Sequence, residues 1–197
     1  MLKVALTGGI ATGKSYVLDQ FRQRGIACLD ADALAHGATA PGTEATRAIA
    51  ERFGPDVVAA DGTVDRQKLG AIVFADANAR RDLEAIIHPA VYRAIAAGLR
   101  AFELLGDPLV VVDVPLLYES GHQADFDRVI VTSCPEDLQL RRLAERGLTD
   151  AEARQRLAAQ WPSADKVERA DFVIRTDGTF PDTNGQVEDI LRKLATR

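Results

Sequence analysis

The chain opens with an apolar run that leads into a glycine-rich loop and then into an amphipathic helical pattern. Residues 8 to 15 read Gly-Gly-Ile-Ala-Thr-Gly-Lys-Ser and fill the pattern G-x-x-x-x-G-K-[ST]. A strand before such a loop and a helix after it direct successive backbone N–H groups to one point, where the helix adds its partial positive charge. The pattern therefore predicts a strand–loop–helix unit that cradles the phosphates of a nucleoside triphosphate.

Individual positions of this loop have separate tasks. Gly8 and Gly13 allow backbone conformations and close approaches that a Cβ would block. Lys14 can reach the outer phosphates, and the Ser15 hydroxyl is placed to bind Mg²⁺. Tyr16 follows on the first turn of the predicted helix, where we expect it to narrow the approach to the α-phosphate.

Composition limits the classes of protein to which the chain can belong. It has 197 residues, enough for one domain or for one core with insertions, and its net charge is −5. No segment concentrates basic residues enough to suggest a nucleic-acid binding surface, so we expect no nucleic-acid partner. No apolar stretch approaches the length of a membrane span, and Cys28 and Cys134 fit packing residues of a reducing compartment. We expect a cytoplasmic protein with no membrane partner.

Five short apolar runs are typical of buried parallel strands, and helical patterns separate them. This alternation predicts an α/β fold with a doubly wound parallel sheet, whose ligands collect at the carboxyl ends of the strands. The runs are Val4–Leu6, Ile26–Leu29, Leu109–Val112, Val129–Val131 and Phe172–Ile174.

Two insertions interrupt the alternation. Roughly eighty residues separate the second and third runs, with helical patterns over 45–53, 69–74 and 80–105, which is too long for one crossover. A second, arginine-rich helical stretch is either a solvated surface or a lid over the triphosphate. We therefore predict a nucleotide-binding core of residues 1–32, 106–134 and 170–197, a helical substrate domain of residues 33–105, and a lid of residues 135–169.

Aspartates follow two of the predicted strands, at the sheet edge where ligands are expected. Asp113 ends the third run and can hold Mg²⁺ together with Ser15, although a strand-end turn is the alternative role. In Asp30-Ala31-Asp32, one carboxylate can cap the next helix while the other accepts a proton from an acceptor hydroxyl. We favour Asp32 as this general base; both could instead be caps or neighbours of the metal.

The nucleotide is expected to be ATP. A guanine-reading [NT]-K-x-D sequence is absent from the chain, which disfavours a GTPase switch.

The motifs together resemble the dephospho-coenzyme A kinase family, and they occur in order along nearly the whole chain. Beyond the phosphate loop and Asp30–Asp32, the resemblance rests on residues 61–66, 69–70, 73–74, 88–89 and 113–119. In the second insertion it rests on Gln139, Arg142, Arg146, residues 148–149 and 152–153, Arg156 and Gln160, and it ends with residues 170–174.

This resemblance implies an ATP-dependent transfer of phosphate to the ribose 3′-hydroxyl of dephospho-coenzyme A. It implies a P-loop NTPase fold with a five-stranded parallel sheet, an inserted helical substrate domain and a helical lid. It also implies catalytic roles for Asp32, Lys14 and Arg142, the last as a lid arginine on the transferring phosphoryl group. The implied nucleotide contacts are Gly8, Gly9, Ile10, Ala11, Thr12, Gly13, Lys14, Ser15, Tyr16 and Gly178; the implied metal contacts are Ser15 and Asp113; the implied substrate contacts are Asp32, Asp65, Arg66, His88, Leu116 and Glu119.

Some positions depart from the family pattern or allow a second role. Thr176 stands where the family commonly has asparagine near the adenine, and Trp161-Pro162 stands where methionine-proline is usual. His88 is either a substrate contact or a packing residue at a helix start.

Two other functions stay open on sequence grounds. A small-metabolite kinase with another acceptor would use the same chemistry, and a nucleotide-dependent switch would use the same loop without transfer. We expect a monomer or a small homo-oligomer.

Overall fold

The computed structural model describes residues 1–195, and the chain divides into two compact units. The first contains Met1–Leu29 and the chain from Phe102 onward, and the second contains Asp30–Ala101. The segment of residues 135–169 lies within the first unit. The predicted division into core, substrate domain and lid stays a prediction, and residues 196 and 197 of that predicted core lie outside the described residues.

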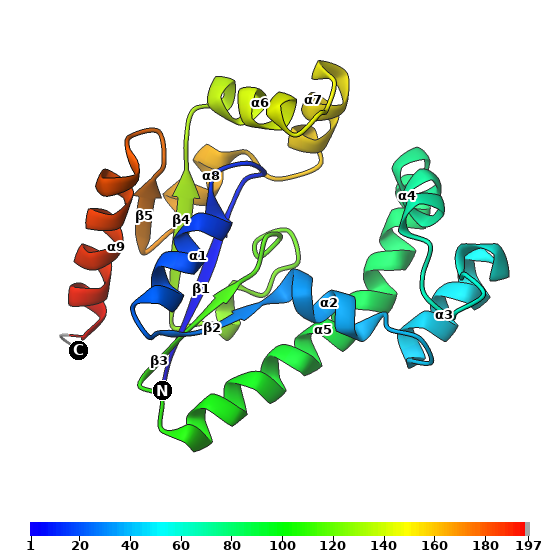
Figure 1. The fold of residues 1–197 in the computed structure, drawn as a ribbon, viewed down its shortest axis with the longest axis horizontal. Coiled ribbons are helices and arrows are strands. Elements are labelled where there is room, and N and C mark those ends of the chain that lie inside the picture. The colour runs from blue at the N-terminus through cyan, green and yellow to red at the C-terminus, as the bar shows by residue number, and fades with distance from the viewer. Residues whose placement is uncertain (196–197) are drawn as a thin grey trace. The chain divides into compact units, whose positions relative to one another are not determined.

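The sheet has five strands in the order β2-β3-β1-β4-β5 (Figure 1). The central strand pairs in parallel with a neighbour on each side, with Leu6 opposite both Asp113 and Ile130. Each predicted apolar run coincides with one strand, apart from Ile26, which lies just before its strand, and the predicted α/β fold with a parallel sheet is confirmed. The strands are β1 (Leu2–Gly8), β2 (Ala27–Asp30), β3 (Leu109–Asp113), β4 (Arg128–Ser133) and β5 (Phe172–Arg175).

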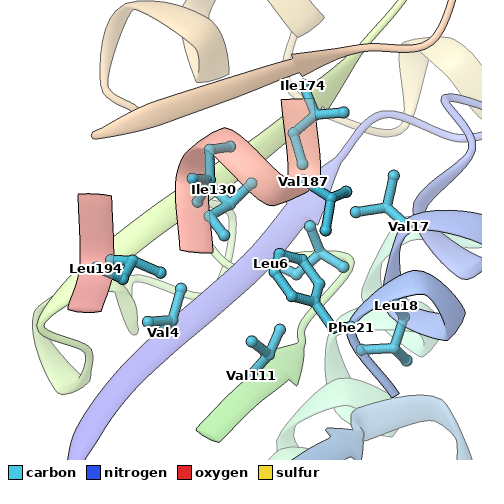
Figure 2. Close-up of a cluster of buried hydrophobic side chains, with 11 residues drawn as sticks. Val4, Leu6, Val17, Leu18, Phe21, Val111, Ile130, Ile174, Val187 and Leu194 are labelled. Atoms are coloured by element: carbon cyan, nitrogen blue, oxygen red, sulfur yellow. The ribbon is translucent and has the colours of Figure 1, made fainter. Parts of the chain in front are cut away.

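The core of the first unit lies between the sheet and two helices, α1 (Lys14–Gln23) and α9 (Phe180–Ala195). Figure 2 shows branched side chains from four strands packed against both helices. Gly25, with φ +76°, follows Arg24, the C-cap of α1, and lets the chain turn toward β2. The buried cluster consists of Val4, Leu6, Val17, Leu18, Phe21, Val111, Ile130, Ile174, Val187, Ile190 and Leu194.

Further helices of the first unit follow β3 and β4. A single 3₁₀ turn, η2 (Gln123–Asp125), precedes β4. Beyond β4 come α6 (Glu136–Glu145), α7 (Asp150–Ala158) and α8 (Ser163–Glu168), which form the predicted arginine-rich insertion.

Helices build the second unit, and side chains cap several of them. They are α2 (Ala31–Ala38), α3 (Glu44–Phe53), α4 (Arg66–Ala75) and most of α5 (Ala77–Leu105), with a 3₁₀ turn, η1 (Pro55–Val57). Asp30, Thr43 and Asp65 accept hydrogen bonds from the first backbone N–H groups of α2, α3 and α4. Ile49, Val57 and Leu69 are the buried residues of a separate core here.

One local expectation is wrong. His88 does not stand at a helix start, because α5 continues through Pro89 from Ala77 to Leu105. A proline removes one helical N–H and crowds the carbonyl four residues earlier, and it usually marks a helix boundary. In α5 the helical turns on both sides of Pro89 outweigh its preference for a helix boundary, and the helix continues.

Over residues 1–195, no helix is both long enough and apolar enough to cross a lipid bilayer.

The core makes a first prediction. Ile130 is fully buried, so Ile130→Ala leaves a cavity and should lower the free energy of unfolding by about 2–5 kcal/mol in urea denaturation. Leu104→Ala is the control, because Leu104 is 89% exposed and its truncation should change stability by about 0.5 kcal/mol or less. Equal losses in the two variants would contradict this account of the core.

Candidate functional site

The glycine-rich loop joins the carboxyl end of β1 to the first turn of α1. Gly13 caps α1 with a left-handed backbone, φ +85° and ψ +18°, and Lys14 begins the helix. The first N–H groups of a helix have no intrahelical acceptor, so they are available to an anion. A Cβ on Gly8 would lie 2.6 Å from the backbone oxygen of Thr132, so only glycine fits where β1 meets β4.

The carbonyl groups of the loop are held by donors from the protein. Four successive carbonyl oxygens each accept a side-chain hydrogen bond, and the donors come from the loop itself, from α6 and from the segment after β5. Thr12 Oγ1 donates to Gly9 (2.7 Å), Gln139 Nε2 to Ile10 (2.6 Å), Arg142 Nη1 to Ala11 (3.0 Å) and Thr176 Oγ1 to Thr12 (2.8 Å). Fixing these carbonyls leaves the N–H groups at the start of α1, which have no intrahelical acceptor, for an anion.

The middle of the loop is strained. Ala11 has φ +59°, and no other non-glycine residue among residues 1–195 has a positive φ. For a residue with a Cβ this conformation costs about 1–2 kcal/mol. The side chains of Ile10 and Ala11 pack with Leu143 of α6 and Ala153 of α7, so apolar contacts join the loop to these helices.

Arg142 connects α6 to two other segments. Besides the Ala11 carbonyl, its guanidinium donates to the carbonyl oxygen of Thr176 (2.7 Å) and to the Thr176 hydroxyl (3.3 Å). Cys134 Sγ lies 3.6 Å from Nη1, and burial raises the pKa of that thiol. The arginine that the resemblance assigns to the phosphoryl group thus lies against the phosphate loop.

A cavity of about 360 Å³ opens beside the start of α1. Tyr16 forms one wall: its ring centroid lies 4.6 Å from that of Phe180, and its hydroxyl donates to Asn184 Oδ1 (2.9 Å). The size suits a nucleoside, and the cavity begins where the phosphate loop ends. It is lined by Gly13, Tyr16, Arg142, Thr176, Gly178, Thr179, Phe180, Pro181 and Thr183.

Asp113 and Ser15 offer oxygen atoms next to the loop. Asp113 is only 6% exposed, at the end of β3 opposite Leu6 of β1, whereas Ser15 is exposed on the first turn of α1. A carboxylate and a hydroxyl are oxygen donors of the kind that Mg²⁺ prefers, and this ion retains several waters in protein sites. No group of three or more His, Cys, Asp or Glu side chains that could hold a metal occurs among the described residues. The donor set therefore fits an ion that is also held by substrate phosphates and water.

Glu119 forms a buried ion pair with Lys166 of α8. The Lys166 side chain is 0% exposed, and its Nζ lies 2.7 Å from Glu119 Oε1, which also accepts the Trp161 N–H (2.9 Å). Burial lowers the pKa of Lys166, and Glu119 opposes that shift. The resemblance assigns Glu119 to the substrate, and that contact stays a prediction; Leu116, the other predicted contact in this segment, is half-buried.

A larger cavity, about 650 Å³, lies beside Gly9 and is lined mainly by residues of 134–164. Trp161 and Gln160 are among its walls, and the Trp161 ring stacks on Tyr118 with centroids 6.0 Å apart. This cavity adjoins the phosphate loop on the side of Gln139 and Ser163, since both side chains crowd Gly9.

The other predicted residues lie in the second unit. Asp30 accepts from the N–H groups of Asp32 and Ala33, so its predicted capping role is confirmed, and Asp32 is exposed in the first turn of α2. Asp65 caps α4, and the Lys68 N–H lowers the pKa of its carboxyl.

Two further predicted substrate contacts have partners within this unit. Arg66 Nη2 donates to Thr39 Oγ1 (3.3 Å), and His88 meets Tyr92 edge to face, with centroids 6.3 Å apart. Neither contact tests a role in binding substrate.

Sequence reasoning assigned no role to several polar side chains that shape the site: Gln139, Gln160, Lys166 and the hydroxyl of Thr176. The available signal was weak. Gln139 and Arg142 are three residues apart, which puts both on one face of α6 and toward the same partner.

Residues 2–182 match the model of the dephospho-CoA kinase family. A dephospho-CoA kinase of Geobacillus kaustophilus is 46% identical over 193 residues, with 98% of this chain and 96% of that protein covered. One from Anaeromyxobacter dehalogenans is 48% identical over 195 residues, with 98% and 92% covered. The structure of a dephospho-CoA kinase from Campylobacter jejuni superimposes with a TM-score of 0.74 at 26% identity, covering 98% of this chain and 97% of that one.

The buried ion pair makes a second prediction. Lys166→Met leaves the Glu119 carboxylate buried without its counter-ion and should lower the free energy of unfolding by about 3–5 kcal/mol in urea denaturation. Adding Glu119→Gln should restore part of that loss, because the double variant buries no unpaired charge.

The exposed pair Arg22–Asp19 (2.9 Å) supplies the control. Arg22→Met should change stability by about 1 kcal/mol or less, because solvent screens exposed ion pairs. Strictly additive losses for Lys166→Met and Glu119→Gln would contradict a coupled pair.

Proposed function

The chain belongs to the dephospho-CoA kinase family, and from this membership we infer that it phosphorylates dephospho-coenzyme A with ATP to give coenzyme A. The phosphate is transferred to the ribose 3′-hydroxyl. The observation that carries this conclusion is the family match over residues 2–182, which includes an intact phosphate loop followed by a helix. It favours this kinase over a small-metabolite kinase with another acceptor and over a nucleotide switch.

We propose that the phosphate loop and Lys14 bind the triphosphate. N–H groups at the start of α1 face the β- and γ-phosphates, and the ammonium of Lys14 neutralises charge that develops during in-line transfer. The nucleoside then occupies the cavity lined by Tyr16 and Gly178. Arg142 completes the proposed catalytic set: its guanidinium contacts the Ala11 carbonyl of the loop, and the residue lines that cavity.

Asp32 is the proposed general base. Asp30 caps α2, and Asp32 is exposed in the first turn of that helix, where we propose that its carboxylate accepts the proton of a substrate hydroxyl. A carboxylate that accepts the hydroxyl proton makes the oxygen a better nucleophile toward the γ-phosphate. Asp65, Arg66, His88, Leu116 and Glu119 stay proposed contacts of the acceptor substrate.

Ser15 and Asp113 are the proposed protein contacts of Mg²⁺. When bound, the ion neutralises phosphate charge. The Ser15 hydroxyl and the buried Asp113 carboxylate would orient it beside the first turn of α1. We further propose that the protein acts in the cytoplasm as a monomer or small homo-oligomer, without a nucleic-acid or membrane partner.

The direct test is ADP release by purified protein with ATP and Mg²⁺, with and without dephospho-coenzyme A. We expect a rate that depends on the acceptor, with coenzyme A as the product, and a loss of at least about a hundredfold in Lys14→Met. No acceptor-dependent rate from protein that binds ATP would contradict the proposed substrate.

A fourth prediction concerns the base. Asp32→Asn should lower turnover by about 10²–10⁴-fold, because an amide cannot accept the proton, while ATP affinity stays within about twofold. Asp30→Asn is the matched control, since asparagine caps a helix as well as aspartate does. Near-normal turnover in Asp32→Asn would exclude Asp32 as the base.

A further inference from the structure

Two glutamine side chains form hydrogen bonds with the backbone N–H and the backbone carbonyl of one residue in the phosphate loop. Gln160 Oε1 accepts a hydrogen bond from the Ile10 N–H (2.9 Å), and Gln139 Nε2 donates to the Ile10 carbonyl (2.6 Å). Gln139 lies on α6 and is only 3% exposed, and Gln160 follows α7. Both polar groups of Ile10 are therefore fixed by side chains from residues 135–169.

The strained residue, Ala11, directly follows Ile10. Ala11 has φ +59°, and its own carbonyl is held by Arg142. A left-handed conformation in a residue with a Cβ persists only where the surroundings determine it. With Ile10 fixed at both polar groups and Ala11 fixed at its carbonyl, the loop cannot relax to a negative φ without losing hydrogen bonds.

We propose that Gln139 and Gln160 are positioning residues for ATP: they hold the strained loop in the conformation that binds phosphate, acting through the backbone of Ile10. The proposal rests on the kinase function inferred above. It assigns opposite requirements to the two positions, because position 139 must donate a hydrogen bond and position 160 must accept one. A packing role alone would impose no such difference.

The first experiment measures the Kd of ATP by calorimetry, the KM of ATP, kcat and Tm. Gln139→Met, Gln139→Glu and Gln160→Met should each weaken ATP binding by about tenfold, since one part-buried hydrogen bond to the loop is lost. Gln160→Glu keeps an acceptor and should bind ATP at least about threefold more tightly than Gln160→Met. Gln155→Met, an exposed change in α7, should leave affinity unchanged.

The second experiment adds Ala11→Gly, which removes the strain because glycine adopts a positive φ freely. In this background the effect of Gln139→Met or Gln160→Met on ATP affinity, relative to Ala11→Gly alone, should fall to about twofold. Coupling of this kind is expected only between groups that act on the same conformation.

Several results would overturn the proposal. These are equal fold-losses in the wild-type and Ala11→Gly backgrounds, a fall in Tm without a change in Kd, or equal affinities for Gln160→Glu and Gln160→Met. If the variants of the buried Gln139 misfold, the comparison of ATP affinity between Gln160→Glu and Gln160→Met, at a half-buried position, still tests the proposal. If ATP binding depends on the two glutamines but turnover does not depend on dephospho-coenzyme A, the proposed substrate is rejected and the positioning role is supported. If the wild type binds no ATP, both proposals are overturned.

Discussion

The structure depends on one requirement of the phosphate loop: a backbone that turns its N–H groups toward an anion must turn carbonyl groups toward the protein. A buried carbonyl without a donor costs about 1–3 kcal/mol. Here four successive carbonyls find donors, and three of these donors come from side chains at positions 139, 142 and 176. The shape of an eight-residue loop near the N-terminus is therefore fixed by residues more than a hundred positions away.

The features that the sequence predicts are local, whereas the donors to the loop carbonyls are distant from the loop in the sequence. The strand, loop and first helix are local, and buried parallel strands are recognisable because both faces are apolar. The five strands and the cap at Asp30 are accordingly confirmed. The helical pattern predicted over 80–105 is confirmed as well: α5 continues through Pro89, although a proline usually marks a helix boundary, because helical turns form on both sides of it.

The donors to the loop could not be predicted from pattern alone. Gln139, Gln160 and Thr176 lie in polar stretches that look like solvated surface, and their partners are backbone atoms distant in the sequence. Thr176 shows the difference most clearly. As a departure from the family's asparagine it raises a question about adenine binding, yet its hydroxyl donates to the carbonyl of Thr12 and so supports the phosphate loop.

Arg142 explains how one side chain can belong to two parts of the site. Its guanidinium has five donors in a rigid plane, so it reaches the carbonyls of Ala11 and Thr176 together while the same side chain lines the nucleoside-sized cavity. A lysine has a single ammonium on a flexible chain and could not fix two acceptors on different segments in one geometry. Arginine at this position therefore connects α6 to both the phosphate loop and the wall of the cavity. For this reason a polar side chain on α6 can affect the conformation of a loop that is distant from it in the sequence.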